Sequence, residues 1–134
     1  GSLAIADASG AIASVEFGCP DAQIERAQSG GFVHTNHFLS APLARPMTNS
    51  VNDRSSIGRL KVLERALPNL IQSATRQDIQ AQMSAHGEQD HRLCLHAGSG
   101  SSFTISSVVY LCQTNELLFS GGPPCQNNWQ TFTL

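Results

Sequence analysis

Residues 53–67 read DRSSIGRLKVLERAL, and they decide the fold class because they carry the clearest helical pattern in the chain. Apolar residues recur in this stretch at helical spacing, namely Ile57, Leu60, Leu63 and Leu67. A side-chain oxygen that can cap the start of the helix is offered by Asp53, Ser55 or Ser56. Pro68 is expected to end the helix or to start a turn. The basic residues around the helix are expected to face solvent: Arg54, Arg59, Lys61 and Arg65.

Patterns typical of β-strands precede this helix. Residues 3–6 form a short apolar run, residues 7–10 are turn formers, and residues 11–17 alternate between the two faces of a strand, which together predict a hairpin. Residues 22–27 are a weaker strand candidate, and residues 32–35 are expected to form another strand. Residues 40–52 contain two prolines and several small polar residues, which indicates a loop.

Residues 75–84 predict a second, more polar helix, and strand patterns return after it. Strands are expected at residues 92–95, 103–112 and 116–120, with a tight turn at 113–115. The segment 103–112 is rich in β-branched residues and is expected to be a central strand. Strands, two helices and further strands, in that order, predict an α+β fold with mostly antiparallel strands in a single domain over residues 1–134.

The composition fits one globular domain and argues against several classes of partner. The 134 residues are 40% hydrophobic and 13% charged, with a net charge of −2. Nucleic-acid-binding proteins normally carry a basic excess, and no stretch approaches the roughly 18 apolar residues of a membrane span, so neither partner is expected. The low charge suggests that something else covers much of the surface.

The cysteines are widely and irregularly spaced, at Cys19, Cys94, Cys112 and Cys125. Free, buried thiols in a reducing compartment are therefore expected rather than a disulfide framework. Because the first residues also lack the basic flank and long apolar core of a signal peptide, we expect a cytoplasmic protein.

The densest polar cluster is His34-Thr35-Asn36-His37, at the end of a predicted strand. Alternation along a strand would send His34 and Asn36 to one face and Thr35 and His37 to the other. The Asn36 amide can donate hydrogen bonds to the oxyanion that forms when a carbonyl is attacked, and one such donor is worth about 2.7–4 kcal/mol in the transition state. The alternative is that Asn36 caps a turn and that the histidines bond to backbone carbonyls.

A second group of residues has metal-ligating side chains: His86, His91, Cys94 and His96. The spacing matches no established zinc motif, and a further ligand would have to come from afar. We therefore expect ordinary loop and core residues here, with no bound metal or cofactor. A small zinc protein that uses His91, Cys94 and His96 remains an alternative hypothesis.

Several segments resemble one known family in their order and approximate spacing. Residues 32–39 read FVHTNHFL, with SVEF at 14–17 upstream of them and RLKVL at 59–63, TISSVVY at 104–110 and LFSGGP at 118–123 downstream. Together they resemble the acyl-coenzyme A:6-aminopenicillanic acid acyltransferase family of the N-terminal nucleophile (Ntn) hydrolases. The resemblance extends over nearly the whole chain.

The resemblance implies an αββα sandwich and the cleavage of an amide or a thioester. In this family a precursor cuts itself, and the new N-terminal cysteine is the nucleophile, with its own α-amine as the base. By resemblance, Asn36 takes the oxyanion-stabilising position. The neighbouring His34, Thr35 and His37 would support Asn36 or line the substrate pocket.

The chain departs from the family at two places. The family's nucleophile lies well upstream of the V-H-T-N-H segment, and no residue here matches it. The family's active-site arginine, in an S-R-G motif, is replaced by Ser101, which would then be among the substrate-binding residues. The resemblance thus implies the C-terminal fragment of a longer enzyme, inactive alone. Its partners would be the upstream half that carries the nucleophile and a small amide or acyl-thioester substrate.

A binding or assembly module without chemistry of its own is the alternative from a different class. An exposed sheet face would then drive self-association into a homo-oligomer.

Overall fold

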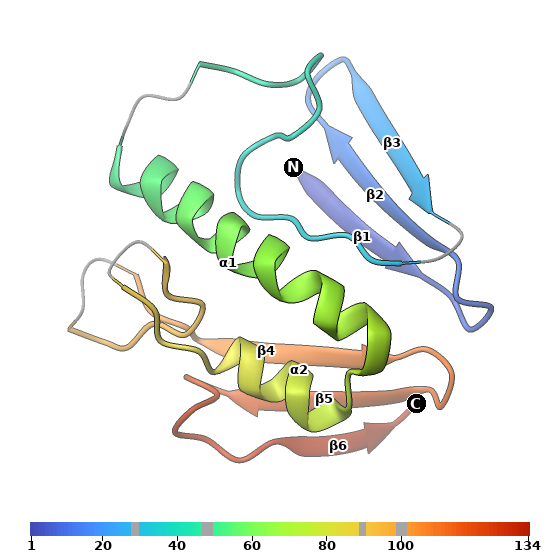
Figure 1. The fold of residues 1–134 in the computed structure, drawn as a ribbon, viewed down its shortest axis with the longest axis vertical. Coiled ribbons are helices and arrows are strands. Elements are labelled where there is room, and N and C mark those ends of the chain that lie inside the picture. Colours follow the sequence, from blue (N-terminus) through green and yellow to red (C-terminus); the bar gives the residue numbers. More distant parts are fainter. Residues whose placement is uncertain (28–29, 47–49, 89–90, 99–101) are drawn as a thin grey trace.

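A computed structural model describes residues 1–27, 30–46, 50–88, 91–98 and 102–134, which form two three-stranded antiparallel sheets and two helices (Figure 1). The first sheet has the order β1 (Ser2–Ala6), β2 (Ile12–Phe17), β3 (Ala22–Ala27), and the second has the order β4 (Ser106–Leu111), β5 (Glu116–Gly121), β6 (Gln130–Thr133). Between the two groups of strands lie α1 (Val51–Ser73) and α2 (Arg76–Met83). The predicted α+β class, with two helices between two groups of antiparallel strands, is confirmed. Within the described residues, neither helix is long and apolar enough to cross a membrane.

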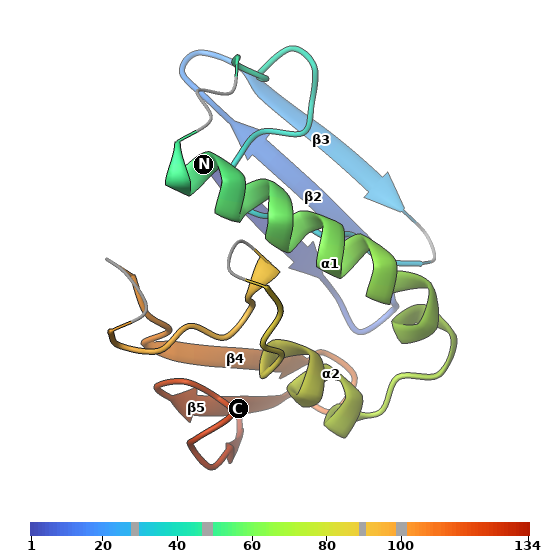
Figure 2. The same ribbon diagram turned by 60° about the vertical axis from the view of Figure 1, so that its left-hand side comes forward.

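Helix α1 runs between the two sheets, and α2 packs against β4 (Figures 1 and 2). An ion pair between Arg76 of α2 and Glu116 of β5 adds to this contact. On the side of the first sheet, α1 packs closely against the segment that leads to His34. A Cβ atom on Gly31 would lie 2.8 Å from Leu67 Cδ1, so a larger residue here would displace the Leu67 side chain.

The long helix differs from its prediction at both ends. Its N-cap is Ser50, whose hydroxyl accepts a hydrogen bond from the Asp53 amide at 3.2 Å, so the predicted capping residues lie inside the helix. Pro68 also lies inside the helix, although it removes one backbone hydrogen bond. Leu70 and Ile71, which follow Pro68, line an apolar hollow together with residues of α2 and residues 30–33. This apolar contact beyond Pro68 favours continuation of the helix.

Helix α2 forms where the sequence predicts it. A capping box closes its first turn: the Thr75 hydroxyl accepts from the Asp78 amide at 3.3 Å, and the Asp78 carboxylate accepts from the Thr75 amide at 2.7 Å.

The strand predictions are confirmed for five strands, with small shifts of their ends, and differ from the structure at four points. Residues 32–35 and 92–95 are irregular. In the first segment, the His34 and Thr35 side chains bind Glu16 and the Ser56 carbonyl, and no strand ladder forms. In the second, the Ala85 carbonyl and the Thr104 hydroxyl bind backbone amides in place of a neighbouring strand. The segment around β4 is an edge strand, and β5 is the central one. Strand β6 was not predicted, since four residues that end in Thr-Phe-Thr carry too short a pattern.

Each sheet leaves an apolar face exposed. In the first sheet, register places Leu3, Val15 and Ile24 side by side on one face, and Leu3 and Ile24 are 56% and 58% exposed. Glu16, on the opposite face, is buried. In the second sheet, Leu118 and Ser120 are buried, whereas Val108 and Phe132 on the other face are each close to half exposed.

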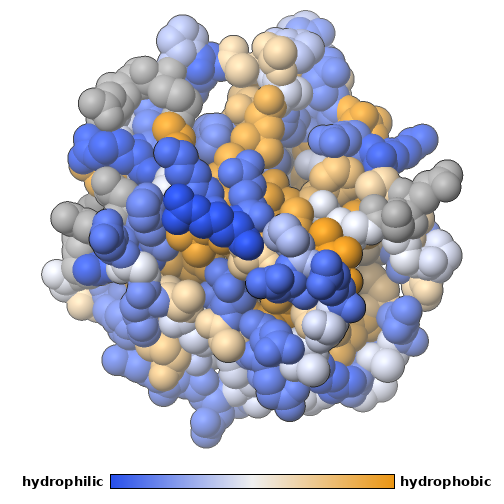
Figure 3. All heavy atoms as spheres, viewed as in Figure 1, coloured by the Kyte–Doolittle hydropathy of each residue, from blue (hydrophilic) through white to orange (hydrophobic). Residues whose placement is uncertain are grey.

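The chain exposes far more surface than a compact protein of its mass. It exposes 8784 Å², whereas a compact monomer of this mass exposes about 6,800 Å². The buried apolar residues within the described ranges are Leu60, Cys94 and Leu118. Hydrophobic residues accordingly reach the surface in several patches among polar ones (Figure 3). The excess of about 2,000 Å² is more than the roughly 800 Å² that one partner contributes to a standard protein interface.

Candidate active site

The carboxylate of Glu16, on the buried face of β2, fastens the segment 34–40. Its oxygens accept hydrogen bonds from the Leu39 amide at 2.5 Å and the Ser40 amide at 2.8 Å, and His34 Nε2 lies 2.6 Å from Oε1. Burial alone would raise the pKa of this carboxyl, but hydrogen bonds from Ser40, Leu39 and His34 outweigh it and lower the pKa to about 2. Glu16 is therefore a buried anion that binds both ends of the segment to the first sheet.

The hydroxyl of Ser56, buried in α1, fastens the middle of the same segment. Ser56 Oγ accepts hydrogen bonds from the Asn36 amide at 2.9 Å and the His37 amide at 3.2 Å, and it lies 2.8 Å from His37 Nδ1. The Thr35 hydroxyl donates to the Ser56 carbonyl at 2.9 Å. The segment is thus held between β2 on one side and α1 on the other.

These two attachments leave the Asn36 side chain exposed and oriented. Arg59 Nη2 donates a hydrogen bond to Asn36 Oδ1 at 2.6 Å. Arginine can only donate, so this contact identifies the amide oxygen and directs the NH₂ group elsewhere. No described residue accepts a hydrogen bond from the Asn36 NH₂ group. Asn36 and Arg59 line an open hollow of about 490 Å³ with Ser55, Leu93, Ser102 and other residues.

This hollow combines an amide donor with a cation. Burial lowers the pKa of the Arg59 guanidinium from its usual value, yet arginine stays protonated at neutral pH. A carbonyl oxygen that entered the hollow beside Asn36 would meet a neutral donor and a positive charge, the groups that stabilise a developing oxyanion. Arg59 was expected to face solvent with the other basic residues of the helix, but its guanidinium binds the Asn36 side chain instead.

A serine and a histidine lie together near this hollow, at Ser56 and His37. Their separation of 2.8 Å is within the range of a nucleophile and its base. The Ser56 hydroxyl, however, is 2% exposed and already contacts two backbone amides and the Thr35 hydroxyl. The pair holds the loop and offers no accessible nucleophile.

The four residues of the predicted cluster have different surroundings. Asn36 is exposed at the hollow, as the oxyanion hypothesis requires, whereas Thr35 and His37 contact Ser56 and His34 contacts Glu16. Since residues 32–35 form no strand, the expected alternation does not order these side chains. His34, Thr35 and His37 support the loop, and a direct contact with substrate stays a prediction. Ser101 lies outside the described residues.

Sequence reasoning missed Glu16, Ser56 and Arg59 as parts of this site. Glu16 carried a signal, as an acidic residue on an otherwise apolar strand, because a buried carboxylate needs several donors. Ser56 and Arg59 lie three residues apart, on one face of the predicted helix, and this spacing was the available signal.

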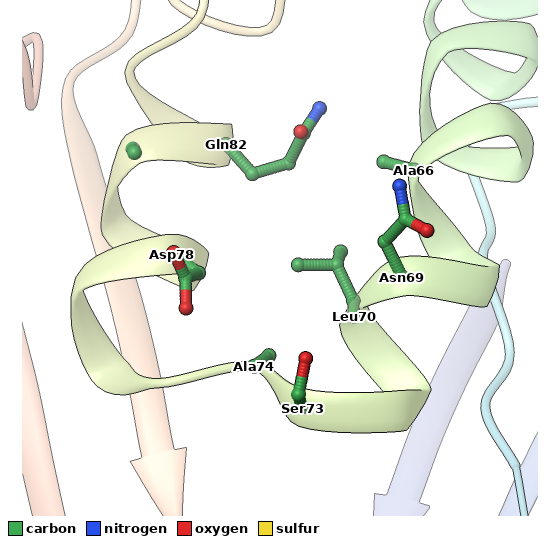
Figure 4. Close-up of a pocket in the computed structure, with 8 residues that line it drawn as sticks. Ala66, Asn69, Leu70, Ser73, Ala74, Asp78 and Gln82 are labelled. Carbon is green, nitrogen blue, oxygen red and sulfur yellow. The ribbon is translucent and has the colours of Figure 1, made fainter.

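A second hollow, of about 440 Å³, lies between α1 and α2 (Figure 4). Asn69 and Leu70 of α1 face Asp78 and Gln82 of α2 across it. Asp78 is engaged in the capping box of α2, and the other side chains are small, apolar or amide groups. Its described lining residues include no arginine, lysine or histidine, so it lacks the cation beside an amide donor that makes the Asn36 hollow the candidate active site.

The sequence matches no protein-family model and no curated protein. The resemblance to the acyltransferase family therefore stays a prediction.

Loss of the Glu16 charge should destabilise the protein. Because its folded pKa of about 2 lies below the ordinary 4.5, the carboxylate stabilises the fold above about pH 4.5, and this contribution disappears as the pH falls toward 2. The shift corresponds to about 3 kcal/mol in the free energy of unfolding. Urea unfolding of Glu16→Gln and of the wild type at pH 7, 4 and 2.5 measures it. The difference should shrink with acid, and the exposed Glu25→Gln should show no such pattern; equal stability of Glu16→Gln and wild type at pH 7 would contradict the assignment.

Removal of the Ser56 hydroxyl should also destabilise the protein, because the Asn36 and His37 amides would lose their acceptor. We expect Ser56→Ala to lower the free energy of unfolding by about 2 kcal/mol. Ser55→Ala, on the same helix turn, should change it by less than about 0.5 kcal/mol. Urea unfolding at pH 7 followed by circular dichroism compares the two, and similar midpoints for both variants would refute the role of Ser56.

Proposed function

We propose that this chain supplies the oxyanion-binding half of an Ntn-type acyltransferase or amidohydrolase, and that the attacking thiol comes from another segment. The observation that carries the proposal is the Arg59–Asn36 hydrogen bond, which leaves an unpaired amide donor at an open hollow. Substrates would be small amides or acyl thioesters, whose carbonyl oxygen becomes negative on attack.

The local chemistry supports this role over that of a complete catalytic centre. The described residues that line the hollow include no cysteine and no histidine, so the donor is present without a nucleophile and base. Arg59 offers a positive charge 2.6 Å from the Asn36 oxygen. It would supply the cation that the family places at the position of Ser101.

The exposed sheet faces support a partner segment. The first sheet has a face on which Leu3, Val15 and Ile24 lie in register. This face favours a covering partner, since burial of apolar surface stabilises a complex by about 25 cal/mol per Å². We propose that the upstream half covers such a face and completes an αββα sandwich. The excess exposed area of about 2,000 Å² is sufficient for a stable interface.

Replacement of the donor should abolish most of the activity of the assembled enzyme. Asn36→Asp keeps the size and the oxygen that accepts from Arg59, but it replaces the NH₂ donor by a negative oxygen. With the chain co-expressed with the upstream segment, we expect kcat for amide or thioester cleavage to fall about 100–1000-fold, with a smaller change in KM.

Asn69→Asp is the matched control, because Asn69 is an exposed asparagine of α1 that lines the other hollow. It should retain the wild-type kcat. The proposal fails if Asn36→Asp retains wild-type kcat, or if the chain without the upstream segment turns over substrate.

Self-association is the second candidate function, and the same exposed apolar faces favour it. Light scattering after size exclusion distinguishes the two: a stable homo-oligomer is expected if a second copy covers the faces. A monomer would count against assembly. Leu3→Ser combined with Ile24→Ser should return an oligomer to a monomer if the first sheet forms the interface.

A further inference from the structure

Four metal-ligating side chains converge beside the second sheet, away from Asn36. Their ligand atoms all lie within 4.8 Å of one another, and the residues are His86, Cys94, His96 and Cys125. His86 follows α2, Cys94 and His96 belong to the irregular segment after it, and Cys125 lies in the turn after β5. Three separate parts of the chain thus deliver ligands to one point.

We propose that one Zn²⁺ ion binds at a structural site whose ligands are His86, Cys94, His96 and Cys125. The donor set is two sulfurs and two imidazole nitrogens, which is one of the standard sets of structural zinc. All four tetrahedral positions would be filled by protein, so no position remains for a catalytic water. Two thiolates would neutralise the charge of the ion, which suits a site that includes the buried Cys94.

Three of the six distances between the ligand atoms lie close to the edges of a zinc tetrahedron. His86 Nε2 and His96 Nε2 are 2.9 Å apart, the Cys94 and Cys125 sulfurs are 3.5 Å apart, and Cys125 Sγ lies 3.3 Å from His96 Nε2. Zn–N and Zn–S bonds of ordinary length give edges of about 3.3, 3.8 and 3.6 Å for these pairs. These three separations are each a few tenths of an ångström short, and the other three lie within 4.8 Å, so small shifts of the four side chains would admit the ion.

A disulfide is the competing reading of the two cysteines. Their sulfurs are 3.5 Å apart, well beyond the bonded distance of about 2.05 Å, and both thiols are free. A disulfide would also involve only the two cysteines and would not account for His86 and His96, whose side chains meet at the same point. The four residues together therefore favour the metal over the disulfide.

The backbone around the ligands is already ordered by hydrogen bonds. The Cys94 amide donates to the Ala85 carbonyl at 3.1 Å, and the Leu95 amide donates to the Thr104 hydroxyl at 3.0 Å. Little chain entropy would remain to be lost on binding, and the ion would join the segment after α2 to the β5–β6 connection. Leu93 and Leu95, which alternate with the ligands Cys94 and His96, line the Asn36 hollow, so the ion would also hold one wall of the candidate active site.

The structure brings together a set of ligands that differs from the group weighed in the sequence. His91 does not belong to the group, and Cys125, thirty-one residues beyond Cys94, completes it. With free cysteines at four positions, only Cys94 is buried, so the expectation of buried thiols holds for one of them.

Metal analysis of the whole chain tests the proposal directly. Protein purified under reducing conditions, stripped with a chelator and dialysed against Zn²⁺ should retain one equivalent. Cys125→Ser and His86→Gln, both at exposed positions, should each weaken Zn²⁺ binding at least tenfold in competition with a chromogenic chelator. The matched controls Cys19→Ser and His91→Gln should bind as the wild type does.

Cobalt spectroscopy of the wild type keeps the test independent of the folding of the variants. Co²⁺ should give the intense visible bands of tetrahedral coordination together with thiolate-to-metal charge transfer. Retention of less than a tenth of an equivalent of Zn²⁺, unchanged affinity in a folded Cys125→Ser, octahedral cobalt bands, or a Cys94–Cys125 disulfide in the reduced preparation would each overturn the proposal. Because no measurement depends on enzymatic activity, the outcome is separate from that of the proposed function.

Discussion

The structure depends on one short segment, residues 34–40, being bound from two sides by two buried oxygen-bearing side chains. Glu16 reaches it from β2, and Ser56 reaches it from α1. The segment therefore links the first sheet to α1 without a direct hydrogen bond between their backbones. A carboxylate taken out of water is costly unless several donors surround it, and here two amides and an imidazole do so. The first sheet and the long helix are therefore coupled through the polar contacts that this segment makes with both.

That coupling also explains the orientation of Asn36. Its main chain is fixed by Ser56, and its side-chain oxygen is fixed by Arg59 three residues further along the same helix. One helix turn thus positions both the backbone and the amide of a single residue. An oxyanion donor is useful only when it needs no reorganisation during the reaction. In the cluster of residues 34–37, three side chains hold the loop, and they keep the fourth, Asn36, in a fixed position.

The sequence predicted the helices and strands that depend on local pattern. It did not predict the features that depend on a contact with a residue distant in sequence. Both helices and five strands follow from periodicity and turn formers. The segment 32–35 has the apolar start of a strand, but Glu16 and Ser56 supply its partners, and neither is near in sequence. Asn36 was identified from its residue type and neighbours, whereas the bond from Arg59 depends on how the loop crosses α1. The ligand Cys125 could not be assigned to its cluster for the same reason, because only the turn after β5 brings it there.

Because the apolar core is small, the buried polar contacts contribute a large part of the stability of the fold. With three apolar residues buried in the described ranges and an apolar face exposed on each sheet, burial alone stabilises this chain less than it would a compact domain of equal length. Point attachments then carry a larger share of the free energy of folding, namely the Glu16 carboxylate and the Ser56 hydroxyl. Both bind residues 34–40, one from β2 and the other from α1. A chain organised in this way can keep its local geometry while each sheet has an exposed apolar face.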